Sequence, residues 1–233
     1  PGRRDYTWTA DTIKNPYLDL YHIWGNSLTN LWTSSTMYSA SLFRYDGTKW
    51  LLDNRTYLPT PAALWGYEDK LWIGNGSGCI WQFTGSSYLE QVKYHKLGDY
   101  YTQFQDLVGT SDKEIYITGA YWKNGIHNTI LMKYDGVNWK VDKIFDKRCS
   151  IIQFKYSPKT DKYYLTMKYP NDNTEIVYEY DRTNCKEIYS YVYVNVGPTI
   201  SVIDGYPYVI IENEVYRYRN DKLELITGIK LPY

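Results

Sequence analysis

IWGNSLTNLWTSSTMYSASLFRYDGTKW, residues 23–50, shares its landmarks with LWGYEDKLWIGNGSGCIWQFTGSSY, residues 64–88. Each stretch has Trp-Gly near its start, then Leu-Trp, and ends in a short segment between two aromatic residues. Motifs that return in the same order form an internal repeat, and the length of a repeat indicates the architecture. The paired landmarks are Trp24-Gly25 and Trp65-Gly66, Leu31-Trp32 and Leu71-Trp72, and Tyr45–Trp50 and Phe83–Tyr88.

Three further copies, in residues 107–139, 154–185 and 201–223, follow with a step of about 40–48 residues. The most regular element is a six-residue hairpin: an aromatic residue, four turn residues and an apolar residue. Asp-Gly in these turns supplies the positive φ angles that tight hairpin loops need. The five hairpins are Tyr45–Trp50, Phe83–Tyr88, Tyr134–Trp139, Tyr180–Cys185 and Tyr218–Leu223.

Between the hairpins, apolar and polar residues alternate, as in EIYIT (114–118) and EIVYEY (175–180). Val, Ile, Tyr and Thr dominate these segments, and no stretch of about twelve residues has the 3.6-residue period of a helix, so we predict strands. A repeat of this length with four antiparallel strands is typical of one blade of a β-propeller.

We therefore predict an all-β fold: a single β-propeller domain over residues 5–227, with five four-stranded blades plus an extra N-terminal strand. The extra strand, residues 5–13, matches the last strand of a repeat, because Trp8–Ile13 resembles Trp139–Ile144. It either adds a fifth strand where the ring closes or is the remnant of an upstream blade. The predicted blades cover about 20–54, 62–94, 106–145, 151–193 and 199–227.

The composition argues against several classes of partner. The 233 residues include 26 basic and 26 acidic ones without long blocks, so we expect no nucleic-acid binding. No apolar run approaches the roughly 20 residues of a membrane span. Three scattered histidines and three cysteines without metal-ligand spacing predict no metal and no cofactor. The opening PGRRDY has no initiator Met or signal peptide and indicates a processed or trimmed chain.

The cysteines Cys79, Cys149 and Cys185 are expected to form no disulfide. Cys149 follows the last strand of a blade, whereas Cys185 ends a hairpin turn at the opposite end of the sheet. That separation should exceed the roughly 7 Å between Cα atoms that a disulfide spans. The tryptophans of the repeat are expected to pack between blades, where Gly beside Trp admits close backbone approach. They are Trp24, Trp32, Trp65 and Trp72.

The repeat resembles that of exported bacterial propellers whose blades read W-G-[ST]-x-x-[DN]-[LIV]-[WY]-x-x-G and then L-x-[HR]-Y-D-G-x-x-W. The resemblance covers nearly all of residues 5–227 and weakens in the fourth and fifth copies. Such proteins are often labelled "putative glucosyl hydrolase". The matching residues are structural, so the resemblance implies the fold and an extracellular or cell-surface location, and it carries no catalytic site.

One face of the predicted propeller collects the long and dissimilar loops, while the other consists of short repetitive turns. The loop face includes residues 34–40, 54–62, 95–105, 119–128 and 168–174. Loops on a rigid scaffold are where binding usually occurs, and exposed aromatic rings suit a protein or sugar contact. The candidate binding residues are Tyr38, Tyr57, Tyr100, Tyr101, Phe104, Tyr121, Trp122 and Tyr169.

These features favour a non-catalytic surface module that binds a protein or a polysaccharide through its loop face. An upstream domain or assembly partner at the N-terminal strand is a further expected contact. The alternative is a glycoside hydrolase with its active site at the channel mouth, which requires two carboxylates about 5–10 Å apart. Only Asp106, with His22 at the equivalent position of the first blade, lies where such a carboxylate would act. We therefore predict no catalytic residue.

Overall fold

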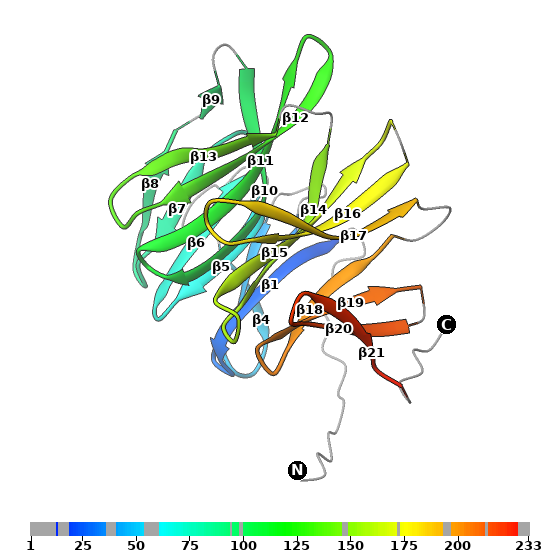
Figure 1. The fold of residues 1–233 in the computed structure, drawn as a ribbon. Coiled ribbons are helices and arrows are strands. Elements are labelled where there is room, and N and C mark those ends of the chain that lie inside the picture. Colours follow the sequence, from blue (N-terminus) through cyan, green and yellow to red (C-terminus); the bar gives the residue numbers. More distant parts are fainter. Residues whose placement is uncertain are drawn as a thin grey trace.

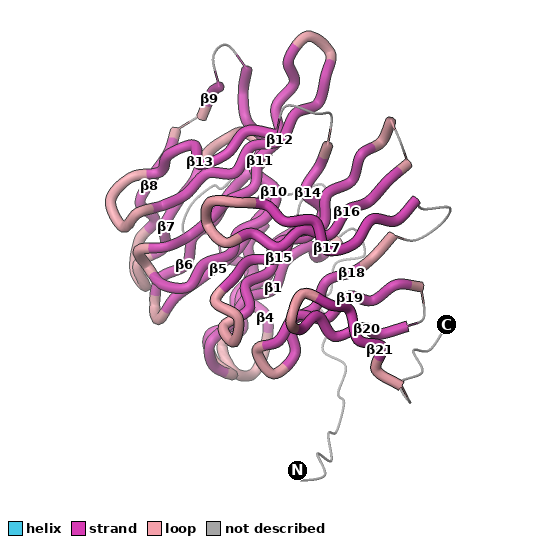
Figure 2. The backbone as a smooth tube through the Cα atoms, in the orientation of Figure 1, coloured by secondary structure: helices cyan, strands magenta, loops and turns pink. Residues whose placement is uncertain are grey.

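Each copy of the repeat folds into one antiparallel β-sheet (Figure 1). The computed structural model describes residues 13, 19–35, 41–53, 61–93, 95–97, 100–145, 149–171, 173–192, 197–212 and 214–227. Within these ranges the chain forms 21 strands and no helix, and short loops join most of the strands (Figure 2). The predicted extra strand at residues 5–13 lies outside the described residues, except for Ile13.

The strands follow one another in chain order within each sheet. Sheet 1 contains β1 (Leu20–Ser27), β2 (Asn30–Ser35), β3 (Ser41–Tyr45) and β4 (Trp50–Asp53). Sheet 2 contains β5 (Pro61–Tyr67), β6 (Lys70–Asn75), β7 (Ile80–Phe83) and β8 (Tyr88–Val92). Sheet 3 contains β9 (Lys96–Leu97), β10 (Tyr100–Ser111), β11 (Glu114–Lys123), β12 (Ile126–Tyr134) and β13 (Trp139–Phe145). Sheet 4 contains β14 (Ser150–Ser157), β15 (Lys162–Tyr169), β16 (Thr174–Tyr180) and β17 (Cys185–Val192). Sheet 5 contains β18 (Thr199–Ile203), β19 (Tyr206–Ile211), β20 (Glu214–Arg219) and β21 (Lys222–Leu225).

Successive sheets meet through the first long strand of each repeat. Strand β1 contacts β5, β5 contacts β10, β10 contacts β14, and β14 contacts β18. These strands therefore lie toward the middle of the molecule, and the fourth strands lie toward the outside, as in a propeller. The prediction of five antiparallel sheets of four strands is confirmed, with one addition. The short strand β9 pairs with β10 and extends sheet 3.

The hairpins between third and fourth strands use one turn chemistry. In three of them an Asp side-chain oxygen accepts the backbone N–H groups two and three residues ahead, at 2.7–3.0 Å. These residues are Asp46, Asp135 and Asp181. The third hairpin residue has positive φ in all five sheets, as Asp-Gly predicts. It is Gly47, Gly85, Gly136, Arg182 and Asn220.

Trp-Gly joins neighbouring sheets. A Cβ on Gly66 of sheet 2 would lie 2.4 Å from the Trp24 ring of sheet 1, and a Cβ on Gly109 of sheet 3 would lie 2.7 Å from the Trp65 ring of sheet 2. Only glycine leaves room for an indole ring directly against the backbone of the next sheet. Both rings are only half-buried, so they cover the interface from its edge.

The aromatic residue of each second strand contacts the aromatic residue that opens the hairpin of the next sheet. Trp32 lies 5.1 Å from Phe83, and Trp72 lies 6.4 Å from Tyr134, measured between ring centroids. Sheets 3 and 4 meet in the same way through Tyr116 and Tyr180 at 6.0 Å, and sheets 4 and 5 through Tyr164 and Tyr218 at 6.0 Å. Leu-Trp and the hairpin therefore repeat together because they are the two halves of one contact.

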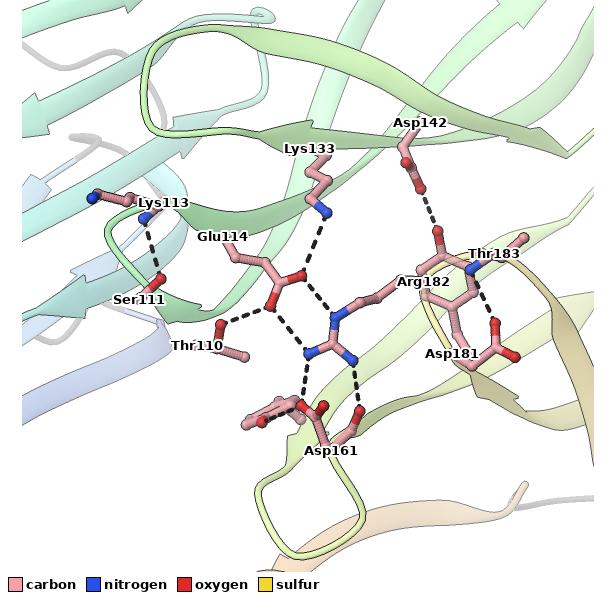
Figure 3. A network of polar contacts seen from close by, with 12 residues as sticks. Thr110, Ser111, Lys113, Glu114, Lys133, Asp142, Asp161, Asp181, Arg182 and Thr183 are labelled. Carbon is pink, nitrogen blue, oxygen red and sulfur yellow. Dashed lines mark hydrogen bonds and ion pairs between the residues drawn. The ribbon is translucent and has the colours of Figure 1, made fainter.

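A charged cluster connects sheets 3 and 4 where the hairpin turns lie (Figure 3). Arg182 donates to both carboxylate oxygens of Glu114, at 2.8 and 3.1 Å, and to Asp161 at 2.7 Å. Thr110 and Lys133 also donate to Glu114. Arg182 stands at a hairpin position that is glycine in the first three sheets, with a φ of 77°. An Arg at this strained position supplies a bridge that glycine could not make.

The three cysteines are free thiols. Cys79 and Cys149 are buried, and Cys185 is half-buried. Burial raises the pKa of Cys149 to about 11, which keeps its thiol protonated and unreactive near neutral pH.

Candidate binding surface

Sheet 3 is built from longer strands than its neighbours. Strands β10, β11 and β12 contain 12, 10 and 9 residues. In Figure 1 the tip of the β11–β12 hairpin, and β9 with the start of β10, extend past the other sheets at the top of the view. Asn124 and Gly125 close that hairpin at φ values of 53° and 75°, which the tight Asn-Gly turn requires.

Two predicted loops are therefore largely strand. Residues 119–128 form the end of the β11–β12 hairpin, and residues 100–105, expected within a loop over 95–105, form the start of β10. The expectation that Phe104 and Tyr121 are exposed is wrong, because their side chains are only 1% and 5% exposed and pack in the core of sheet 3. Alternate residues of a strand point to opposite faces, so these two rings point inward.

Tyr101 and Trp122 occupy the opposite face of the same sheet. Their side chains are 55% and 51% exposed. Their neighbours Thr102 and Tyr121 are paired across β10 and β11 and are buried, so Tyr101 and Trp122 both point outward. Trp122 also pairs with His127, and the two rings meet edge to face at 4.9 Å.

Local contacts hold these two rings in place. The Lys96 ammonium lies 4.2 Å from the centroid of the Tyr101 ring, a cation–π contact from β9. Tyr100 is half-buried, packs against the core of sheet 3 and donates a hydrogen bond to Asn124 Oδ1 at 3.2 Å. It therefore supports the tip of the hairpin more than it presents a surface. We call the set Lys96, Tyr101, Trp122, Ile126 and His127 the hairpin surface.

The remaining predicted residues do not belong to the hairpin surface. Tyr169 is half-buried, and its hydroxyl lies 3.2 Å from that of Tyr178 in a groove of about 400 Å³ between sheets 3 and 4. This groove is lined by Lys143, Phe145, Met167, Tyr169, Tyr178, Asn184 and Cys185. Tyr38 and Tyr57 lie outside the described residues.

A second set of polar residues lies on the inner strands. His22 of β1 and Asp106 of β10 approach to 4.0 Å between Nδ1 and Oδ1. Burial raises the pKa of Asp106, although the positive charges of Lys155 and His22 oppose this, and burial lowers the pKa of His22. The carboxylate oxygen Oδ1 of Asp106 accepts the N–H of Leu107 at 2.9 Å. The charged side chains that act on Asp106 are thus basic, whereas glycoside hydrolysis calls for a second carboxylate.

Replacing Asp106 with Asn is expected to stabilise the protein at pH 7. Because the folded state raises the pKa of Asp106, its ionised form is less favourable in the folded protein than in the unfolded chain. The amide of the Asp106→Asn variant would keep an acceptor for Leu107 without the charge. Urea unfolding at pH 7 and at pH 4 measures the effect, which should shrink at the lower pH as Asp106 becomes protonated. A loss of stability at pH 7 would show that the charge is needed.

Within the described ranges, no three His, Cys, Asp or Glu side chains lie close enough together to hold a metal ion. The described part of the chain also contains no helix whose length and hydropathy would let it cross a membrane.

No protein-family model matches the sequence, and no curated protein matches it. Solved structures do match. A structure described as YCF48 bound to D1 peptide is 14% identical, with a TM-score of 0.62 over 96% of this chain and 72% of that chain. The β-propeller domain of Cps50 (Swd1) from Myceliophteria thermophila is 10% identical, with a TM-score of 0.61 over 93% and 73%. A luciferin-regenerating enzyme is 14% identical, with a TM-score of 0.59 over 93% and 77%. At these identities the likeness shows the fold alone: this chain is a β-propeller.

Proposed function

We propose that this propeller is a binding module that contacts a macromolecular partner, a protein or a polysaccharide, through the hairpin surface. The observation that carries the proposal is the pair of large aromatic rings, Tyr101 and Trp122, which are more than half exposed on one rigid sheet face. Rigid aromatic side chains lose little conformational entropy on binding and supply much of the contact energy of interfaces.

The fold by itself does not choose between binding and catalysis, since the similar structures include a protein bound to a peptide and an enzyme. The surroundings of Asp106 supply two basic side chains, His22 and Lys155, and thus favour binding over hydrolysis. Location at the cell surface or outside the cell is part of the proposal and rests on the resemblance of the repeats to exported propellers.

The test is a double variant, Tyr101→Ala with Trp122→Ala. Ligands are first selected on the wild-type protein from a random peptide display library and from an array of immobilised polysaccharides. The affinity of the double variant for the selected ligands is expected to be at least about 100-fold lower than that of the wild type, because a few aromatic anchors carry most of the contact energy. Thermal unfolding should stay within a few degrees of the wild type, because both side chains are largely exposed.

The matched control is Tyr21→Ala, which removes a tyrosine that is 57% exposed on β1 of sheet 1. It should bind the selected ligands as the wild type does. Ligands that bind the double variant unchanged, or that are lost only in Tyr21→Ala, would place the contact elsewhere. Glycan turnover that disappears in Asp106→Asn would restore the hydrolase alternative.

A further inference from the structure

Turns of sheets 4 and 5 line a cavity of about 420 Å³ at the end of the propeller that carries the short hairpin turns. This volume lies within the range of small-molecule sites. We call it the turn-end cavity. Its lining comes from both sheets: Thr160, Lys162, Tyr164, Glu179, Tyr206, Tyr218, Arg219, Asn220 and Asp221.

Tyrosine provides the apolar part of the lining. Tyr164 and Tyr218 are 1% and 4% exposed and meet edge to face at 6.0 Å, so they form a fixed inner wall. Tyr206 is half-buried, and the Arg217 guanidinium lies 4.1 Å from the centroid of its ring. No aliphatic side chain is among the described lining residues. A lipid tail or an aliphatic peptide side chain would therefore find little apolar surface there.

The charges of the lining balance. The lining contains two basic residues, Lys162 and Arg219, and two acidic ones, Glu179 and Asp221. Three of these four charges are also neutralised locally, because Lys162 pairs with Glu179 at 2.6 Å, and Lys186, which lies outside the lining, pairs with Asp221 at 2.7 Å. The remaining lining charge, Arg219, is exposed to solvent, which screens its attraction for an anion, so the electrostatics of the site favour a neutral ligand over a charged one.

The polar groups are held in fixed positions. Glu179 is 6% exposed, and its carboxylate accepts from Lys162 and from the Tyr164 hydroxyl at 3.3 Å. Tyr218 donates to Asp221 at 3.1 Å. Each carboxylate has about four acceptor positions, so both retain capacity for further donors, while Arg219 and Asn220 add N–H donors.

We propose that the turn-end cavity binds a neutral sugar, as a single residue or the end of a glycan. A pyranose presents an apolar face, which suits a tyrosine wall, and a ring of hydroxyl groups, which suits carboxylate, amide and guanidinium partners. This site is independent of the hairpin surface, and it does not rest on the function proposed for that surface.

The experiment is saturation-transfer-difference NMR on the wild-type protein with the methyl glycosides of glucose, galactose and mannose and with N-acetylglucosamine. Inorganic phosphate serves as the anionic probe and is followed by its effect on the protein's amide spectrum. We expect transfer to at least one sugar, with a dissociation constant on the order of 1 mM, which is typical of so few ligand atoms. Phosphate should not change the chemical shifts of the backbone amides of the residues that line the turn-end cavity.

Two variants test the location of the site. Tyr206→Ala removes the half-buried ring, and Arg219→Ala removes an exposed donor at no expected cost to folding. Each should weaken sugar binding at least about fivefold, since a lost aromatic or charged hydrogen-bond contact has roughly that effect. The matched control is Tyr216→Ala, which removes a tyrosine that lies on β20, as Arg219 does, but outside the lining. It should bind the sugar as the wild type does, and so should the double variant of Tyr101 and Trp122.

Absence of transfer to every sugar tested would overturn the proposal. So would equal transfer in the wild type, Tyr206→Ala and Arg219→Ala, or phosphate shifts centred on Lys162 and Arg219, which would show an anion site.

Discussion

Trp72→Ala is expected to destabilise the protein by about 3–5 kcal/mol, the usual cost of truncating a fully buried Trp. The Trp72 side chain is 0% exposed and belongs to the core cluster between sheets 2 and 3. Its ring contacts Trp65 at 5.6 Å and Tyr134 at 6.4 Å. Removing it opens a cavity where the two sheets meet. Urea unfolding measures the loss.

Two control variants distinguish the effect of the cavity at residue 72 from the effect of removing a tryptophan at any position. Trp72→Phe should cost no more than about 1.5 kcal/mol, because Phe keeps most of the ring volume. It also removes an indole N–H that is buried without a hydrogen-bond partner. Trp122→Ala, at 51% exposure, should change stability by no more than about 0.5 kcal/mol. Equal losses in Trp72→Ala and Trp122→Ala would contradict the view that the second-strand aromatic holds the sheets together.

The sheets could be predicted from the sequence because the turn residues and the alternation of apolar and polar residues recur in the same order in each repeat. Asp-Gly turns set the hairpins, and their positive φ angles are found at Gly47 and Gly136. The alternation of apolar and polar residues between the hairpins predicted the strands. What one sequence could not supply was the partner of each motif. Only the structure shows that Trp72 meets the aromatic residue of the next hairpin, Tyr134, and that Trp24 lies on Gly66.

The binding surface was predicted less well, and the reason is the length of strands β10 to β12. The sequence alone places Tyr100 and Trp122 in loops, because irregular stretches between predicted strands usually are loops. The Asn-Gly pair at 124–125 is a signal for a tight hairpin. Alternation along the strand that leads into this turn then assigns the Tyr121 ring to the core and the Trp122 ring to solvent, or the reverse.

The cluster around Arg182 illustrates a different limit. Sheet 4 departs from the repeat, since Asp-Arg replaces Asp-Gly at 181–182. A departure of this kind signals that something else is gained at the position. The sequence does not say what, because Glu114 lies 68 residues earlier and in another sheet.

Arg182→Met is expected to cost about 2 kcal/mol at neutral pH, within the usual range for hydrogen bonds to charged groups. Arg182 and Glu114 are 27% and 19% exposed, so solvent screens their attraction only in part. Met keeps the length of the side chain and removes the donors. The matched control is Lys140→Met, which removes an ion pair between Asp135 and a lysine that is 68% exposed, and it should change the unfolding free energy much less than Arg182→Met.

The effect of Arg182→Met should also depend on pH, which separates the ion pair from the other contacts of Arg182. Burial raises the pKa of Glu114, but hydrogen bonds from Arg182 and Thr110 outweigh it and lower the pKa overall. The hydrogen bond from Arg182 likewise lowers the pKa of Asp161. Carboxylates with lowered pKa values stabilise the fold fully above their unfolded pKa values, about 4, and lose that contribution as the pH falls through the folded values. The difference in unfolding free energy between wild type and Arg182→Met should therefore be constant near neutral pH and shrink below about pH 4. A difference that stays the same down to about pH 2.5 would assign the loss to the cation–π contact between the Arg182 guanidinium, whose carbon lies 5.4 Å from the ring centroid, and Tyr163.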